Sequence, residues 1–224
     1  MKKNIEIKNL SYSFTEKSTP LFDNQNYSIN QNQLTIIKGK NGVGKSTLLQ
    51  IIAADPLVKK NVSGTLTIDG VTYALQSNEY SKFAREKITL VGQKFDEQLV
   101  PEATFQQNLA YASFGKYPSA FSFIKLPAVP LLADTFSLPI NIPVHKLSGG
   151  QRQVLALLMG INRSTKLLLL DEPTATLDEQ NADLVMRCIA KLIKETEITI
   201  LMICHDSSLY HYTTEEILSI SKKK

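Results

Sequence analysis

The feature that most constrains this chain is one octapeptide, Gly39-Lys40-Asn41-Gly42-Val43-Gly44-Lys45-Ser46. It follows the apolar run 34–37 and precedes an apolar-periodic segment at 45–53, so it predicts a glycine-rich turn from a strand into a helix. Glycines let successive backbone N–H groups point inward, and the start of a helix favours anions. The pattern therefore predicts a phosphate-binding loop, in which Lys45 reaches the β- and γ-phosphates and Ser46 offers a hydroxyl to Mg²⁺.

Three further strings follow this loop along the chain. They are Leu147-Ser148-Gly149-Gly150-Gln151, then Leu167-Leu168-Leu169-Leu170-Asp171-Glu172, and last His205 beyond the apolar run 198–203. Asp171 ends a buried strand, where it would hold the same metal ion directly or through water. Glu172 leaves the strand in another direction and can orient an attacking water, so the pair predicts nucleotide hydrolysis as well as binding. From chemistry alone, a surface carboxylate before Pro173 is the alternative for Glu172.

The apolar pattern predicts an α/β fold. The first 37 residues, including the run 34–37, and residues 64–73 with their Asp69-Gly70 hairpin signal alternate in the manner of antiparallel strands. The runs 167–170 and 198–203 are nearly continuous, as expected for parallel strands covered on both faces by helices. Helices are predicted at 45–53, 151–161 and 178–194, and Asp178 suits the N-cap of the last one.

The segment 94–146 differs from the rest of the chain. It holds six of the nine prolines and a group of aromatic residues, Tyr111, Phe114, Tyr117, Phe121, Phe123 and Phe136. A loop of that length without structure is uncommon inside a compact domain, so we expect a small helical subdomain with a helix near 105–114. The chain is then one domain in three parts: 1–93 with an antiparallel β region and the phosphate loop, 94–146, and 147–224 with the rest of the α/β core.

Composition and charge exclude several classes of protein. The net charge of +4 rests largely on lysines near the two ends. The rest of the sequence has no basic stripe of the kind that binds nucleic acid, so nucleic-acid binding is not expected. No window approaches the roughly 18 apolar residues of a spanning helix, and the first residues lack the apolar core of a signal peptide, so a cytoplasmic protein is expected. Cys188 and Cys204 match neither a zinc site nor a CxxC pair and are predicted to be buried and reduced.

Together these motifs resemble the ATP-binding cassette (ABC) ATPases over nearly the whole chain. The resemblance matches 39–46 to the Walker A loop, Leu167–Asp171 to the Walker B strand and 147–151 to the signature motif. It implies a phosphate-loop core with a mostly parallel sheet flanked by helices, an antiparallel β subdomain and a small helical subdomain. It also implies that Glu172 is the catalytic glutamate and that 175–178 is the D-loop.

The same resemblance implies the remaining site residues and the ligands ATP and Mg²⁺. Gln93 matches the glutamine that touches Mg²⁺ and the attacking water, and His205 matches the histidine that contacts the γ-phosphate. An aromatic residue stacks on adenine in this family, which points to Phe14, with Tyr12 as the rival. The candidate residues are Glu172, His205 and Gln93 for catalysis; Phe14, Gly39, Asn41, Gly42, Gly44, Lys45, Ser46, Thr47, Ser148, Gly149, Gly150, Gln151 and Asp178 for nucleotide binding; and Ser46, Gln93 and Asp171 for the metal ion.

The partners implied by the resemblance are a second cassette and a membrane permease. One Walker A loop and one signature imply a head-to-tail dimer, as a homodimer or with a different cassette. The resemblance fits an importer-type transporter or a small efflux-type system, and either implies separate integral membrane subunits and a position on the inner face of the cell membrane. The importer type, which we expect, also implies an extracytoplasmic substrate-binding protein. The aromatic segment 95–143, with Phe114 and Phe121, is the predicted docking surface. The alternative is a soluble cassette of iron–sulfur cluster assembly or another non-transport process, which would have only soluble partners.

Overall fold

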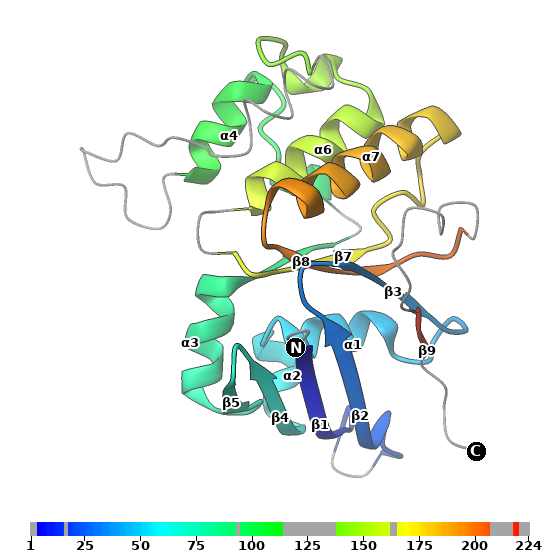
Figure 1. The fold of residues 1–224 in the computed structure, drawn as a ribbon. Helices are drawn as coiled ribbons and strands as arrows, with labels where there is room; N and C mark the ends of the chain where they lie inside the picture. Colours follow the sequence, from blue (N-terminus) through cyan, green and yellow to red (C-terminus); the bar gives the residue numbers. More distant parts are fainter. Residues whose placement is uncertain are drawn as a thin grey trace.

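In this computed structural model the chain is built around two β-sheets, a four-stranded antiparallel sheet and a five-stranded parallel sheet (Figure 1). The structure describes residues 4–15, 18–92, 95–113, 138–161, 165–206 and 217–219. In chain order the elements are β1 (Asn4–Tyr12), β2 (Phe22–Asn30), β3 (Leu34–Lys38), α1 (Lys45–Ile52), α2 (Pro56–Lys59), β4 (Val62–Ile68), β5 (Val71–Ala74), α3 (Asn78–Lys87), β6 (Ile88–Val91), η1 (Phe95–Gln98), α4 (Phe105–Ser113), η2 (Val144–Lys146), α6 (Gly149–Gly160), β7 (Leu167–Asp171), α7 (Glu179–Glu195), β8 (Thr199–Ile203) and β9 (Ile217–Ser219). The predicted α/β fold with a parallel and an antiparallel sheet is confirmed.

The parallel sheet has the strand order β6-β7-β8-β3-β9 and is buried on both faces. Along β7, Leu168 and Leu170 pack into the core shared with α6 and α7, whereas Leu167 and Leu169 pack into the core shared with α1 and the antiparallel sheet. Figure 1 shows these two layers on opposite sides of the strands. Because successive side chains alternate between two dry layers, every position of the strand is apolar.

The antiparallel sheet has the order β2-β1-β4-β5. Its β4–β5 hairpin pairs Ile68 with Val71, which leaves Asp69 and Gly70 as a two-residue turn with φ values of 52° and 80°. Positive φ at both central positions is the I′ geometry that the Asp-Gly signal predicts. The predicted hairpin is confirmed.

The run 34–37 is not one of the antiparallel strands, so that prediction was wrong. It forms β3, which pairs in parallel with β8, Leu34 opposite Ile200. Thr35 is the reason for the error, because its polar side chain suggested an alternating, half-exposed strand although it is only 1% exposed. The phosphate loop therefore leaves the central parallel sheet.

The predicted helices are confirmed within a few residues of their expected ends. They are α1, α4, α6 and α7, and Asp178 caps α7 by accepting a hydrogen bond from the backbone N–H of Asn181. The helical subdomain is described through η1, α4 and η2, whereas residues 114–137, with Phe114 and Phe121, lie outside the described residues.

Two smaller predictions concern cysteines and membrane spans. Cys188 and Cys204 are buried and are not joined in a disulfide, as predicted. None of the helices in the described part of the chain has both the length and the apolar character needed to cross a bilayer.

Candidate active site

The phosphate loop connects the end of β3 to the start of α1. Gly44 precedes the helix with φ 107° and ψ 14°, a backbone conformation that favours glycine. A Cβ at this position would lie 3.0 Å from Leu21 Cδ2 and 3.0 Å from Phe22 Cζ. Both the backbone angle and the close packing therefore require glycine where the loop enters the helix.

The N-terminus of α1 has no side-chain cap. By contrast α2, α3, α6 and α7 each begin with a side chain that accepts a backbone N–H, namely Asp55, Ser77, Ser148 and Asp178. The first helical residues of α1, Lys45, Ser46 and Thr47, line a pocket of about 340 Å³. Helix-start N–H groups without a cap beside a pocket form a ready anion site, which fits a phosphate chain.

The buried lysine of the loop adds a full positive charge to this site. Lys45 is 7% exposed, and its Nζ donates hydrogen bonds to the carbonyl oxygens of Gly39 (2.9 Å) and Lys40 (3.2 Å). These bonds hold the ammonium across the loop. Lys45 also lines the pocket, so the ammonium lies next to it. The ammonium can therefore pair with phosphate oxygens as a positioned point charge.

Asp171 and Ser46 meet where β7 ends beside α1. Burial raises the pKa of the Asp171 carboxyl, and a hydrogen bond from the Ser46 side chain partly offsets that rise. The Oδ1 atom of Asp171 is buried and has no hydrogen-bond partner. A carboxylate oxygen without a partner beside a serine hydroxyl is the oxygen donor set that a hard cation such as Mg²⁺ takes, so the residues fit this ion.

Glu172 has different neighbours from Asp171. Its backbone adopts φ 52° and its N–H donates to the Ile203 carbonyl at 3.2 Å, which turns the chain at the end of the strand. Its Oε1 lies 3.0 Å from Nε2 of His205, and the side chain lines the pocket. The Asp171 carboxylate thus lies next to a serine hydroxyl, and the Glu172 carboxylate lies next to a histidine.

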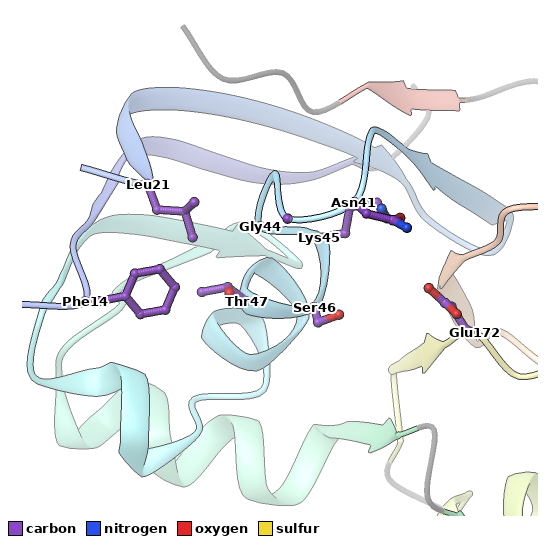
Figure 2. Close-up of a pocket in the computed structure, with 9 residues that line it drawn as sticks. Phe14, Leu21, Asn41, Gly44, Lys45, Ser46, Thr47 and Glu172 are labelled. Atoms are coloured by element: carbon purple, nitrogen blue, oxygen red, sulfur yellow. The ribbon is translucent and has the colours of Figure 1, made fainter. Parts of the chain in front are cut away.

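The opposite end of the pocket is apolar. Figure 2 shows Phe14 and Leu21 at this end, with the start of α1 between them and Glu172. Phe14 is 59% exposed, whereas Tyr12 is 4% exposed and packs edge-on against the Phe14 ring. Strand β1 ends at Tyr12, so Phe14 lies beyond the strand and Tyr12 belongs to the core. An exposed ring at the edge of the pocket can stack on a base.

The structure brings most of the predicted nucleotide-binding residues of the loop into this one pocket. The lining residues are Phe14, Leu21, Asn41, Gly42, Gly44, Lys45, Ser46, Thr47 and Glu172. Leu21 was not predicted from the sequence, because no local signal marks it and it reaches the pocket through backbone pairing with Tyr12 (2.8 Å). Gln93 lies outside the described residues.

The signature residues lie away from the lining of this pocket, at the start of α6. Ser148 caps the helix by accepting the Gln151 N–H, and the Gln151 side chain accepts the Ser148 N–H, which forms a capping box. Ser148 itself is exposed, and so is Asp178 at the start of α7. The chain therefore presents two separate helix starts, one uncapped and lining the pocket, and one capped by an exposed serine.

These features define a phosphate-loop nucleotide-binding domain, and comparison with known proteins identifies its family. The ABC transporter family profile matches residues 22–175, so the chain belongs to the ABC transporter family. Among relatives, the tyrosine transport ATP-binding protein of Clostridioides difficile is 35% identical over 215 residues, covering 90% of this chain and 82% of that protein. The chain is the ATP-binding, ATP-hydrolysing subunit of an ABC transporter, which confirms the resemblance seen in the sequence.

Two solved structures have the same fold. CbiO1 of Clostridium perfringens, part of the ABC transporter complex CbiONQ, matches with a TM-score of 0.82 and 27% identity over 98% of this chain and 85% of that one. The ATP-binding cassette MJ0796 of Methanocaldococcus jannaschii was solved as a dimer in a post-hydrolysis state bound to ADP and Pi. It matches with a TM-score of 0.72 and 27% identity over 96% of this chain and 94% of that one.

Proposed function

We propose that two copies of this subunit bind MgATP head to tail and use its hydrolysis to drive an importer-type permease. The observation that carries the proposal is the pocket itself: an uncapped helix start and a buried ammonium at its centre, and the Glu172–His205 pair at one end. An anion cradle next to a carboxylate that can accept a proton suits hydrolysis of a phosphoanhydride.

Within one subunit, each end of the pocket takes a different part of the nucleotide. The base stacks on Phe14 beside Leu21, and the phosphates receive hydrogen bonds from the N–H groups that begin α1 and from Lys45. Ser46 and Asp171 would hold Mg²⁺, whose charge offsets the negative charge on the β- and γ-phosphate oxygens when it is bound. The unpartnered Asp171 Oδ1 supports this assignment.

Glu172 is the residue that we assign to the attacking water. Its carboxylate can accept the water proton, and the 3.0 Å contact with His205 fixes the orientation of that carboxylate. His205 would also contact the γ-phosphate, and Gln93 would complete the water site, both on the strength of the family resemblance. General-base assistance of this kind contributes about 10²- to 10⁴-fold to a rate.

The signature residues are assigned to the ATP held by a second copy. Ser148, Gly149, Gly150, Gln151 and Asp178 do not line the pocket of their own chain, and Ser148 is exposed. A helix start with a serine hydroxyl can cap an anion brought by another molecule. One chain carries both halves of such a composite site, which favours a homodimer, and the dimeric MJ0796 cassette supports the arrangement.

The importer assignment rests on relatives whose names describe transport. One relative is named a tyrosine transport ATP-binding protein, another is named the methionine import ATP-binding protein MetN, and CbiO1 is part of the ABC transporter complex CbiONQ. We therefore expect separate membrane subunits, an extracytoplasmic substrate-binding protein and a position at the inner face of the membrane for this chain.

The experiment that tests the proposal captures a tagged Glu172→Gln chain from native cells in mild detergent with MgATP. An integral membrane protein recovered with MgATP, and a dimer that a Ser148→Arg change in the same background prevents, are expected. Soluble partners alone would contradict coupling to a permease. A dimer that forms equally well with Ser148→Arg would contradict the head-to-tail arrangement.

A further inference from the structure

Asn181, in the first turn of α7, links the D-loop to the signature motif within one chain. Its side-chain Nδ2 donates to Asp178 Oδ2 at 2.7 Å, and its backbone N–H donates to Asp178 Oδ1 at 2.9 Å. These bonds from Asn181 lower the pKa of the Asp178 carboxyl, which keeps it charged. A carboxylate only accepts hydrogen bonds, so the amide nitrogen of Asn181 must face Asp178 and the amide oxygen must face away.

The amide oxygen of Asn181 faces the signature serine. Ser148 Oγ donates to Asn181 Oδ1 at 2.8 Å and accepts the Gln151 N–H at 3.2 Å. A hydroxyl carries one proton, and here that proton is committed to Asn181. The charge of Asp178 therefore decides the direction of the Ser148 hydroxyl through a single amide group.

Close packing of α6 against α7 maintains this link. A Cβ at Gly150 would lie 2.6 Å from Asn181 Oδ1 and 2.8 Å from Asn181 Cβ, so the two helices meet without room for a larger residue. The Asn181 side chain thus packs against the backbone at Gly150 and also accepts a hydrogen bond from the Ser148 hydroxyl. Because Asn181 is held against Gly150 by this packing, it stays within hydrogen-bond reach of the Ser148 hydroxyl.

We propose that Asn181 is a positioning residue that withholds the Ser148 proton from phosphate in the isolated subunit. This proposal rests on the proposed function, in which Ser148 meets the ATP of a second copy. When two subunits close, Ser148 must exchange its bond to Asn181 for one to a phosphate oxygen. The hydrogen bond from Ser148 to Asn181 therefore opposes closure of the dimer. Asp178 at the D-loop strengthens this effect, because it holds the Asn181 amide with its oxygen toward Ser148.

The test measures ATP-driven dimerisation by sedimentation in the Glu172→Gln background with MgATP. Asn181→Ala removes the competing acceptor, and we expect the dimer Kd to fall about two- to tenfold for each composite site, the range of one net hydrogen bond. Gln180→Ala deletes a neighbouring exposed amide in the same turn and should leave the dimer Kd unchanged. ATP affinity of the separated subunit, measured at low protein concentration, should be the same in both variants.

A double-mutant cycle separates this role from simple helix capping. In a Ser148→Ala background the proton is absent, so Asn181→Ala should no longer tighten the dimer, whereas a capping effect would persist. Asn181→Asp keeps an acceptor for the serine proton and adds charge, so it should weaken the dimer and supplies a second variant if Asn181→Ala folds poorly.

Several results would overturn the inference. They are a weaker or unchanged dimer with Asn181→Ala, an equal effect with and without the Ser148 hydroxyl, or a tighter dimer with Asn181→Asp. Failure of the proposed function has a different signature, because Ser148→Ala alone would then leave ATP-driven dimerisation unchanged.

Discussion

Gly44→Ala tests whether the phosphate loop is held by packing as well as by backbone angle. At φ 107° an alanine costs about 1–2 kcal/mol of backbone strain. Its Cβ would also lie 3.0 Å from two side chains, Leu21 and Phe22, and overpacking of this kind costs about 1–3 kcal/mol. Alanine restricts the unfolded chain and returns about 0.4–1 kcal/mol, so the expected net loss is about 1–5 kcal/mol.

Gly70→Ala is the matched control for this change. Gly70 also has a positive φ, at 80°, but a Cβ there meets nothing within 4 Å, and the hairpin turn does not line the pocket. It therefore bears the backbone strain without the packing cost. The difference between the two variants should be about 1–3 kcal/mol, the packing part alone.

Both urea unfolding and ATP titration are needed, because the loop can relieve the clash by moving. In that case the free protein loses less stability, and ATP must restore the loop geometry when it binds. The loss then appears as a higher Kd for ATP, about tenfold for each 1.4 kcal/mol. The reasoning is refuted if the summed losses for Gly44→Ala stay within about 0.5 kcal/mol of those for Gly70→Ala.

Three further predictions concern the pocket and the cysteines. Glu172→Gln keeps the side-chain size but removes the proton acceptor, so kcat for ATP hydrolysis should fall about 10²- to 10⁴-fold with little change in ATP affinity by calorimetry; near-normal turnover would contradict the assigned role. Phe14→Ala should raise the Kd for ATP by about 5- to 150-fold through lost stacking, with little loss of stability because the ring is exposed, and an unchanged Kd would exclude stacking there. Burial raises the pKa of Cys188 to about 12 and also raises the pKa of Cys204, so neither thiol should react with a thiol reagent near pH 8 until urea is added; rapid labelling of the folded protein would be inconsistent with this.

Elements with strong local patterns were predicted well. The phosphate loop, the hairpin at Asp69-Gly70 and the strand β7 each depend on neighbours in sequence, so turn chemistry and apolar runs are sufficient to locate them. Helix α3 was not predicted, because only Tyr80 and Ala84 are buried along it and its remaining residues are largely polar or charged. Its apolar residues Tyr80, Phe83 and Ala84 follow the i, i+3, i+4 spacing of a helix, but they are only three residues in a strongly polar segment, so the helix was overlooked.

Contacts between distant segments could not be predicted from the sequence. Asn61 Nδ2 donates to the Phe14 carbonyl at 3.0 Å, and Leu21 joins Phe14 at the apolar end of the pocket. Neither residue has a sequence signal of its own, since an asparagine in a loop or a leucine after a proline is ordinary. Their roles arise from which strands and loops pack side by side.

The sequence by itself determined the chemistry that this chain can perform. Backbone N–H groups, the Lys45 ammonium and the two carboxylates at the end of β7 are all encoded in short strings, because each string forms its turn or strand locally. Only the tertiary structure decided which sheet received β3, that Phe14 and not Tyr12 lines the pocket, and that Asn181 meets Ser148. Those outcomes depend on burial and on distances between segments far apart in sequence, which no local pattern specifies.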